Sequence, residues 1–130
     1  MGRLRVLFAD DNDSVRAAVG RLLKEEFELV GTVSNGRELV DAALAHRPDV
    51  IVSDLDMPSL DGLAAMKTLR DAGHTTPFVL LTAIDGDVRN WIEMGATGVV
   101  LKSDLLDLVE AVQSAAVRRV YLSRTLTSEM

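Results

Sequence analysis

Four unbroken apolar runs place the strongest constraint on how this chain folds. They cover residues 6–9 (VLFA), 50–52 (VIV), 78–81 (FVLL) and 99–101 (VVL). A strand with one face in water alternates apolar and polar residues, so these runs indicate strands that are buried on both faces. A fifth, weaker run at residues 29–33 (LVGTV) contains glycine and threonine and is typical of an edge strand.

Segments with apolar residues at helical spacing separate these runs. The clearest begins with Val15, Val19 and Leu22, and the last covers residues 105–116. Strand and helix alternate five times, which predicts βα units joined by right-handed crossovers into a parallel sheet. Because an eight-unit barrel needs about twice the length of this 130-residue chain, we expect an open, doubly wound α/β sheet.

Short polar residues mark where the predicted helices begin. A side chain that accepts a hydrogen bond from the first free backbone N–H groups is preferred at such positions. The candidates are Asp13 or Ser14 for the first helix, Asn35 for the second, Asp61 for the third, and Asp85 or Asp87 for the fourth.

Composition excludes several classes of function. The chain has no cysteine, so disulfides, thiolate zinc sites and cysteine nucleophiles are excluded, and a reducing cytoplasm is the expected location. A net charge of −6 provides no basic field for nucleic acid or for an anionic membrane. No apolar stretch approaches the length of a membrane span. We therefore expect no membrane partner and no direct contact with DNA.

Polar side chains follow the ends of the predicted strands. Asp10 and Asp11 come after the first run, Asp54 after the run at 50–52, Thr82 after the run at 78–81, and Lys102 after the last. The carboxyl ends of parallel strands meet at one edge of the sheet, where open α/β folds bind ligands.

Such crowded carboxylates need a counter-charge. Two carboxylates about 4 Å apart repel by about 4 kcal/mol at an effective dielectric constant of about 20, so a divalent cation is expected among them. Without histidine or cysteine nearby, Mg²⁺ fits better than Zn²⁺ or a full Ca²⁺ cage. Mg²⁺ beside an ammonium and a hydroxyl is the environment a phosphoryl group requires, and one aspartate could then be the nucleophile.

The same residues resemble the receiver domain of two-component response regulators. The resemblance rests on Asp10-Asp11, on residues 54–62 (DLDMPSLDG), on Thr82-Ala83, and on Lys102 after GATG at 95–98, and it extends from residue 4 to about 117. It implies a flavodoxin-like fold of five βα units with strand order 2-1-3-4-5. It also implies a signalling switch that catalyses only its own phosphorylation and dephosphorylation, and no turnover enzyme.

The resemblance assigns a role to each site residue. Asp54 would accept a phosphoryl group from a sensor histidine kinase in a Mg²⁺-dependent reaction. Asp11 and Asp54 would bind Mg²⁺ directly, Asp10 largely through water, and Asp56 through its backbone carbonyl.

The resemblance also implies a conformational switch. Lys102 would pair with the phosphoryl oxygens, and Thr82 would bond one of them and shift. Val99 stands where the family commonly has an aromatic residue that turns inward on activation, so the aromatic half of that switch is in doubt.

Two segments resemble the NarL/FixJ subgroup, namely residues 95–102 (GATGVVLK) and 120–123 (VYLS). Receivers of that subgroup usually precede a DNA-binding domain and control transcription. We therefore expect a receiver domain at residues 1–117, and a C-terminal tail or the start of a linker to an absent output domain at 118–130. The implied partners are a histidine kinase, a second copy of the chain on activation, and DNA only through that output domain.

Two other functions remain as alternatives. Asp54-Leu55-Asp56 is similar to the first motif of haloacid-dehalogenase-type phosphatases, which also use aspartyl phosphate and Mg²⁺. In those enzymes, however, the paired aspartates follow the nucleophile, and Pro58 replaces their usual Thr or Val. The other alternative is a pseudo-receiver that binds partners without a phosphoryl group.

Overall fold

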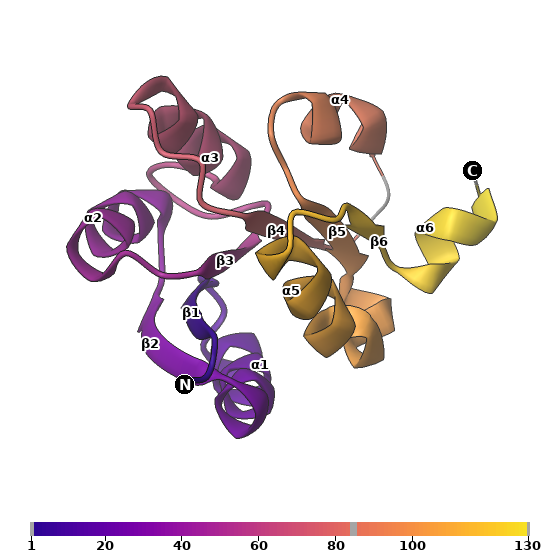
Figure 1. Cartoon of the computed structure of the whole chain (residues 1–130), viewed down its shortest axis with the longest axis horizontal. Coiled ribbons are helices and arrows are strands. Elements are labelled where there is room, and N and C mark those ends of the chain that lie inside the picture. Colours follow the sequence, from indigo (N-terminus) through magenta and orange to yellow (C-terminus); the bar gives the residue numbers. More distant parts are fainter. Residues whose placement is uncertain (1, 84–85, 130) are drawn as a thin grey trace.

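The chain forms a parallel sheet covered by helices on both faces (Figure 1). The computed structural model describes residues 2–83 and 86–129. In chain order the strands are β1 (Arg5–Ala9), β2 (Glu28–Val33), β3 (Val50–Asp54), β4 (Phe78–Thr82), β5 (Gly98–Leu101) and β6 (Tyr121–Leu122). The helices are α1 (Asp13–Glu26), α2 (Gly36–His46), α3 (Gly62–Asp71), α4 (Val88–Glu93), the 3-10 helix η1 (Lys102–Asp107), α5 (Leu108–Ala116) and α6 (Arg124–Glu129).

The strand order is β2-β1-β3-β4-β5-β6, with every neighbouring pair parallel. This confirms the predicted fold and its order 2-1-3-4-5. The difference lies beyond residue 117, where a tail or linker was expected. There β6 extends the sheet beside β5, and α6 follows it.

Two apolar layers explain why the sequence runs are unbroken. Along β1, Val6 and Phe8 face α1 and α5, whereas Leu7 and Ala9 face α2, α3 and α4. The four central strands β1, β3, β4 and β5 alternate in the same way, so each residue is covered whichever face it points to. The outer strand β2 is mostly half-buried, as its mixed composition predicted.

The helix starts follow the predicted chemistry with one correction. Asn35 and Asp61 accept backbone N–H bonds from Glu38 and Ala64 and cap α2 and α3 as expected. For α1, the prediction of Asp13 or Ser14 was wrong. Asn12 caps that helix by accepting from the Val15 N–H, so the helix begins one residue earlier than the aspartate cap would place it.

The start of α4 is the least regular of the four. Asp87 occupies its N-cap position, but within the described residues its side chain makes no capping hydrogen bond. The other candidate, Asp85, lies outside the described residues. Among the helices that are described, none has the length and apolar character needed to cross a membrane.

A glycine at the start of α2 fixes how the loop after β3 packs. A side chain at Gly36 would collide with the carbonyl oxygen of Leu60, and its Cβ would lie 2.6 Å from the Leu60 carbonyl carbon. By contrast, a Cβ at Gly20 inside α1 would meet only the Leu29 and Thr32 side chains, at 3.8 and 3.9 Å. Gly36 and Gly20 therefore offer a test position and a control position for the same substitution.

We expect Gly36→Ala to lower the free energy of unfolding by about 1–3 kcal/mol, because backbone must move to admit the methyl group. Gly20→Ala should instead raise it by about 0.5–1 kcal/mol, because alanine is the better helix former. Urea unfolding followed by circular dichroism measures both. Equal effects of the two substitutions would contradict the close packing of α2 on the loop.

Candidate functional site

The polar residues at the strand ends meet at one edge of the sheet, as the sequence predicted. Asp10 follows β1, Asp54 ends β3, Thr82 ends β4 and Lys102 follows β5. The parallel register aligns these ends, since Asp54 pairs with Leu81 and Thr82 pairs with Leu101. The position of the site is thus a consequence of strand pairing.

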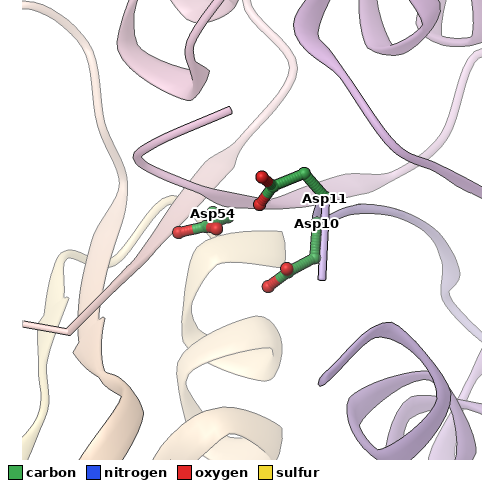
Figure 2. Close-up of side chains that lie close together, drawn as sticks. All are labelled: Asp10, Asp11 and Asp54. Carbon is green, nitrogen blue, oxygen red and sulfur yellow. The ribbon is translucent and has the colours of Figure 1, made fainter. Parts of the chain in front are cut away.

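Three carboxylates form the centre of the site. Asp10, Asp11 and Asp54 each offer an oxygen, and these atoms lie within 4.8 Å of one another. Figure 2 shows the three side chains facing a common space from the ends of two neighbouring strands. Asp10 and Asp54 are buried, at 0% and 5% exposure, whereas Asp11 is exposed. The cluster therefore opens to solvent on the Asp11 side.

Lys102 supplies a positive charge to this cluster. Its Nζ atom lies 3.3 Å from Asp54 Oδ2 and 3.7 Å from Asp10 Oδ2. A single ammonium cannot balance three ionised carboxylates, so negative charge remains in excess. The lysine is about three-quarters buried, which limits screening of both ion pairs by water.

Asp10 is the carboxylate whose contacts compensate its charge least. Its Oδ1 accepts a 2.9 Å hydrogen bond from the Asn12 N–H. Its Oδ2 is buried and has no hydrogen-bond partner among the described residues, apart from the longer ion pair to Lys102. A buried carboxylate oxygen in this condition costs free energy that a bound cation or ordered water would recover.

The donor set fits a hard divalent cation. All three side chains offer carboxylate oxygens, one of them is without a hydrogen-bond partner, and Asp11 leaves the cluster accessible to water. Mg²⁺ binds through few carboxylates and keeps several waters, which matches this set. The cluster could therefore hold such an ion.

Burial raises the pKa of Asp54 from 3.8 to about 6. The neighbouring Asp10 carboxylate contributes to this increase, whereas Lys102 and a hydrogen bond from the Asp56 backbone N–H oppose it, so that about 6 is the net pKa. Since desolvation exceeds the attraction of the lysine, the ionised carboxylate is held in a strained electrostatic state. Groups of this kind concentrate at functional sites.

The other predicted residues occupy different environments. The Asp56 side chain is exposed, but its backbone N–H points toward Asp54, which puts its peptide unit at the rim of the cluster. Thr82 is buried at the end of β4. Val99 is fully buried in β5, on the face covered by α2, α3 and α4, and pairs with Leu80 and Leu122 of the adjoining strands.

Ser53 and Gly62 support the backbone around Asp54, a role that the sequence did not predict for either residue. Ser53 donates its hydroxyl to the Asp54 carbonyl, and the Gly62 N–H donates to the Leu55 carbonyl. A side chain at Gly62 would collide with the Asp54 carbonyl oxygen. Asp61-Gly62 was interpreted only as a helix start. Its second role, a close approach to the backbone of the acidic residue, has the glycine itself as its only sequence signal.

Comparisons with known proteins agree with this geometry. The family model of the response regulator receiver domain matches residues 6–113. A nitrate/nitrite response regulator homologue of Haemophilus influenzae is 37% identical over 129 residues, which is 95% of this chain and 62% of that protein. A protein-glutamate methylesterase/protein-glutamine glutaminase of Archaeoglobus fulgidus is 40% identical over 127 residues, 92% of this chain and 36% of that protein.

Solved structures give the same result. The receiver domain of a NarL response regulator from Mycobacterium tuberculosis superposes with a TM-score of 0.84 at 29% identity, covering 92% of this chain and all of that one. A LuxR-family response regulator from an Aurantimonas species gives a TM-score of 0.90 at 26% identity, over 98% and 94% of the two chains.

The chain therefore belongs to the response regulator receiver domain family of two-component signalling, and its relatives include regulators of the NarL/LuxR type. It spans 36% and 62% of the two curated relatives described above. Family membership favours the receiver over the haloacid-dehalogenase alternative, whose order of aspartates this chain also lacks.

The pKa of Asp54 predicts a pH-dependent cost to folding. The folded-state pKa of about 6 exceeds the reference value of 3.8, so the folded protein binds this proton more tightly than the unfolded chain does. The free energy of unfolding therefore falls as the pH rises from about 4 to about 6. In chelator-treated protein, we expect Asp54→Asn to be about 2 kcal/mol more stable than wild type at pH 7 and nearly equal to it at pH 4.

Urea unfolding at both pH values measures this difference. Asp56→Asn removes an exposed carboxyl two residues away and is the matched control, with stability at pH 7 close to wild type. A stability gain in Asp54→Asn that is the same at pH 4 and pH 7 would show that packing, and not ionisation, produces it.

Proposed function

We propose that Asp54 is the phosphoacceptor of this receiver and takes its phosphoryl group from a phosphohistidine of a sensor histidine kinase. The observation that carries the proposal is the placement of one buried carboxylate, Asp54, between an ammonium and two further carboxylates at a solvent-accessible rim. Its pKa of about 6 leaves the side chain mostly ionised at neutral pH, and its burial keeps it weakly solvated. Both properties favour nucleophilic attack.

In the proposed reaction, an Asp54 carboxylate oxygen attacks the phosphorus. The bond between phosphorus and the histidine nitrogen breaks, and its electron pair remains on the imidazole, which becomes neutral by taking up or retaining a proton. The product is an acyl phosphate on Asp54. Hydrolysis by water would later regenerate the carboxylate and release inorganic phosphate.

The remaining residues would neutralise the negative charge at the site in different ways. Asp11 and Asp54 would hold Mg²⁺ directly, Asp10 largely through water, and Asp56 through its backbone carbonyl. The ion, when bound, offsets negative charge on the phosphoryl oxygens. Lys102, already 3.3 Å from Asp54, would pair with one phosphoryl oxygen, and Thr82 at the adjoining strand end would donate to another.

The proposed output is a shift between two conformations. A partner, or a second copy of the chain, would bind the phosphorylated form better and so read the modification. Several relatives are named as transcriptional regulators, so control of transcription through a DNA-binding output domain is the proposed use. On this proposal the chain works in the cytoplasm and modifies only itself, with residues 1–117 as the phosphoacceptor unit.

Phosphorylation of Asp54 can be tested by intact mass spectrometry after incubation with a small phosphodonor and Mg²⁺. We expect one phosphoryl group per chain, stable in acid and released by base, and none after a metal chelator is added. Asp54→Asn should abolish the adduct, whereas Asp56→Asn, with its exposed side chain, should retain it. An adduct that survives in Asp54→Asn would contradict the assignment, and no adduct in wild type would favour the pseudo-receiver.

Trp91, the single tryptophan, offers a test of the conformational step. It is buried in α4 and lies against Gly86, in the connection that follows Thr82. We expect beryllofluoride, a phosphoryl mimic, to change its fluorescence in wild type in the presence of Mg²⁺. Lys102→Ala should still form the acyl phosphate, though more slowly, yet should lose most of the fluorescence change. A full response in Lys102→Ala would remove the lysine from the switch.

A further inference from the structure

The segment after α5 is held against the same strand that leads into the site. We call residues 121–127, which comprise β6 and the first part of α6, the C-terminal strap; it is the yellow end of the chain in Figure 1. Tyr121 N–H donates to the Thr97 carbonyl at 3.2 Å and Ser123 N–H to the Val99 carbonyl at 3.0 Å. Leu126, at 2% exposure, packs into the apolar layer on the α4 side. The strap therefore covers the outer edge of β5.

Two carboxylates of η1 cap the strap's helix. Asp107 is buried and accepts from the Arg124 backbone N–H at 2.8 Å and from its guanidinium at 2.9 Å. Asp104 accepts from the Thr125 backbone N–H at 3.1 Å and from its hydroxyl at 2.9 Å. Because the first N–H groups of a helix have no partner within it, these contacts supply what α6 itself lacks.

Ser123 joins the strap to the end of β5. It is fully buried, and its hydroxyl oxygen accepts from the Leu101 N–H at 3.0 Å. The same hydroxyl lies beside the Asp104 carboxylate and helps to lower the pKa of Asp104. The residues on each side of Lys102 are thus bound to the strap, Leu101 through its backbone N–H and Asp104 through its carboxylate.

Lys102 is therefore shared by two structures. Its ammonium pairs with Asp54 and Asp10, and its backbone begins η1, whose carboxylates hold α6. A phosphoryl group on Asp54 would place its oxygens beyond the present carboxylate, so the ammonium must leave its position between Asp54 and Asp10. Any shift of residues 101–104 that accompanies this movement would lengthen the contacts to Ser123 and Thr125, which are 3.0 and 3.1 Å long.

The side chains of β5 are poorly suited to transmit a movement of Lys102. Val99 is a small residue, fully buried, and paired with Leu122 of the strap. It has no ring that could turn between an outer and an inner position. Movement at Lys102 therefore reaches the edge of the sheet through η1 and the strap.

We infer that docking of the C-terminal strap is coupled to the state of Asp54, and that phosphorylation loosens residues 121–127 from β5 and η1. The inference rests on the proposed phosphorylation of Asp54. Coupling between two such sites is reciprocal, so a loosened strap must in turn favour the phosphorylated form by the same factor.

Hydrogen exchange of the full chain, followed by nuclear magnetic resonance, tests whether a phosphoryl mimic loosens the strap. With beryllofluoride and Mg²⁺ bound, we expect the amides of Leu101, Arg124 and Thr125 to exchange at least about 5-fold faster, within the usual range of coupling between sites. The amides of Leu7 and Phe8 in β1 are the internal reference and should not accelerate. Unchanged exchange of the strap amides in the bound protein would overturn the inference.

The reciprocal measurement uses a strap-loosening double variant, Arg124→Ala with Thr125→Val. Arg124 is largely exposed and Thr125 is half-buried, so the core should stay folded, which circular dichroism verifies. Beryllofluoride affinity should rise by the same factor by which the mimic loosens the wild-type strap. Arg119→Ala removes the same charge at an exposed position outside the strap and should leave the affinity unchanged. An affinity that does not rise in the double variant would overturn the inference.

Failure of the proposed function and failure of the coupling give different results. If beryllofluoride does not bind wild type and no adduct forms on Asp54, the proposed function fails and the coupling fails with it. If beryllofluoride binds and the strap amides keep their protection, only the coupling fails. A strap that serves stability alone would lower the unfolding temperature of the double variant without raising its affinity for the mimic.

Discussion

The crowding of Asp10, Asp11 and Asp54 is the interaction on which the rest of the structure depends. Three acidic side chains with oxygens within 4.8 Å of one another oppose folding, and Lys102 offsets only part of that repulsion. The cost is met by the rest of the fold, where every residue of the four central strands except Arg5 is buried. Stability from the apolar layers is what allows an unfavourable charge arrangement to persist at one edge.

The sheet also explains why residues so far apart in sequence act together. Parallel pairing brings the ends of β1, β3, β4 and β5 to one side, and each end contributes at least one polar side chain. Three carboxylates, a hydroxyl and an ammonium therefore lie at the same edge of the sheet. Such an arrangement ties the chemistry to strand register, since a slip of one residue would turn every side chain to the opposite face.

The sequence predicted those parts of the molecule that local patterns specify. Unbroken apolar runs identified the central strands, and the residues that follow them identified the acidic cluster and Lys102. The predictions were wrong or incomplete where distant residues decide the outcome. Asn12, and not Asp13 or Ser14, caps α1, and its own backbone N–H is held by the Asp10 carboxylate. The caps of α6 are carboxylates 17 and 21 residues away in sequence, Asp107 and Asp104, and no local pattern marks such a pairing.

The exposure of Asp11 has a consequence for how the cluster exchanges its contents with the surroundings. Asp10 and Asp54 lie beneath the surface, but Asp11 stands at the rim, so a hydrated ion reaches the carboxylates without any strand or helix opening. Among the described residues, nothing therefore separates Asp11 from bulk solvent. Occupancy of this edge by an ion would follow the supply of free ions around the protein.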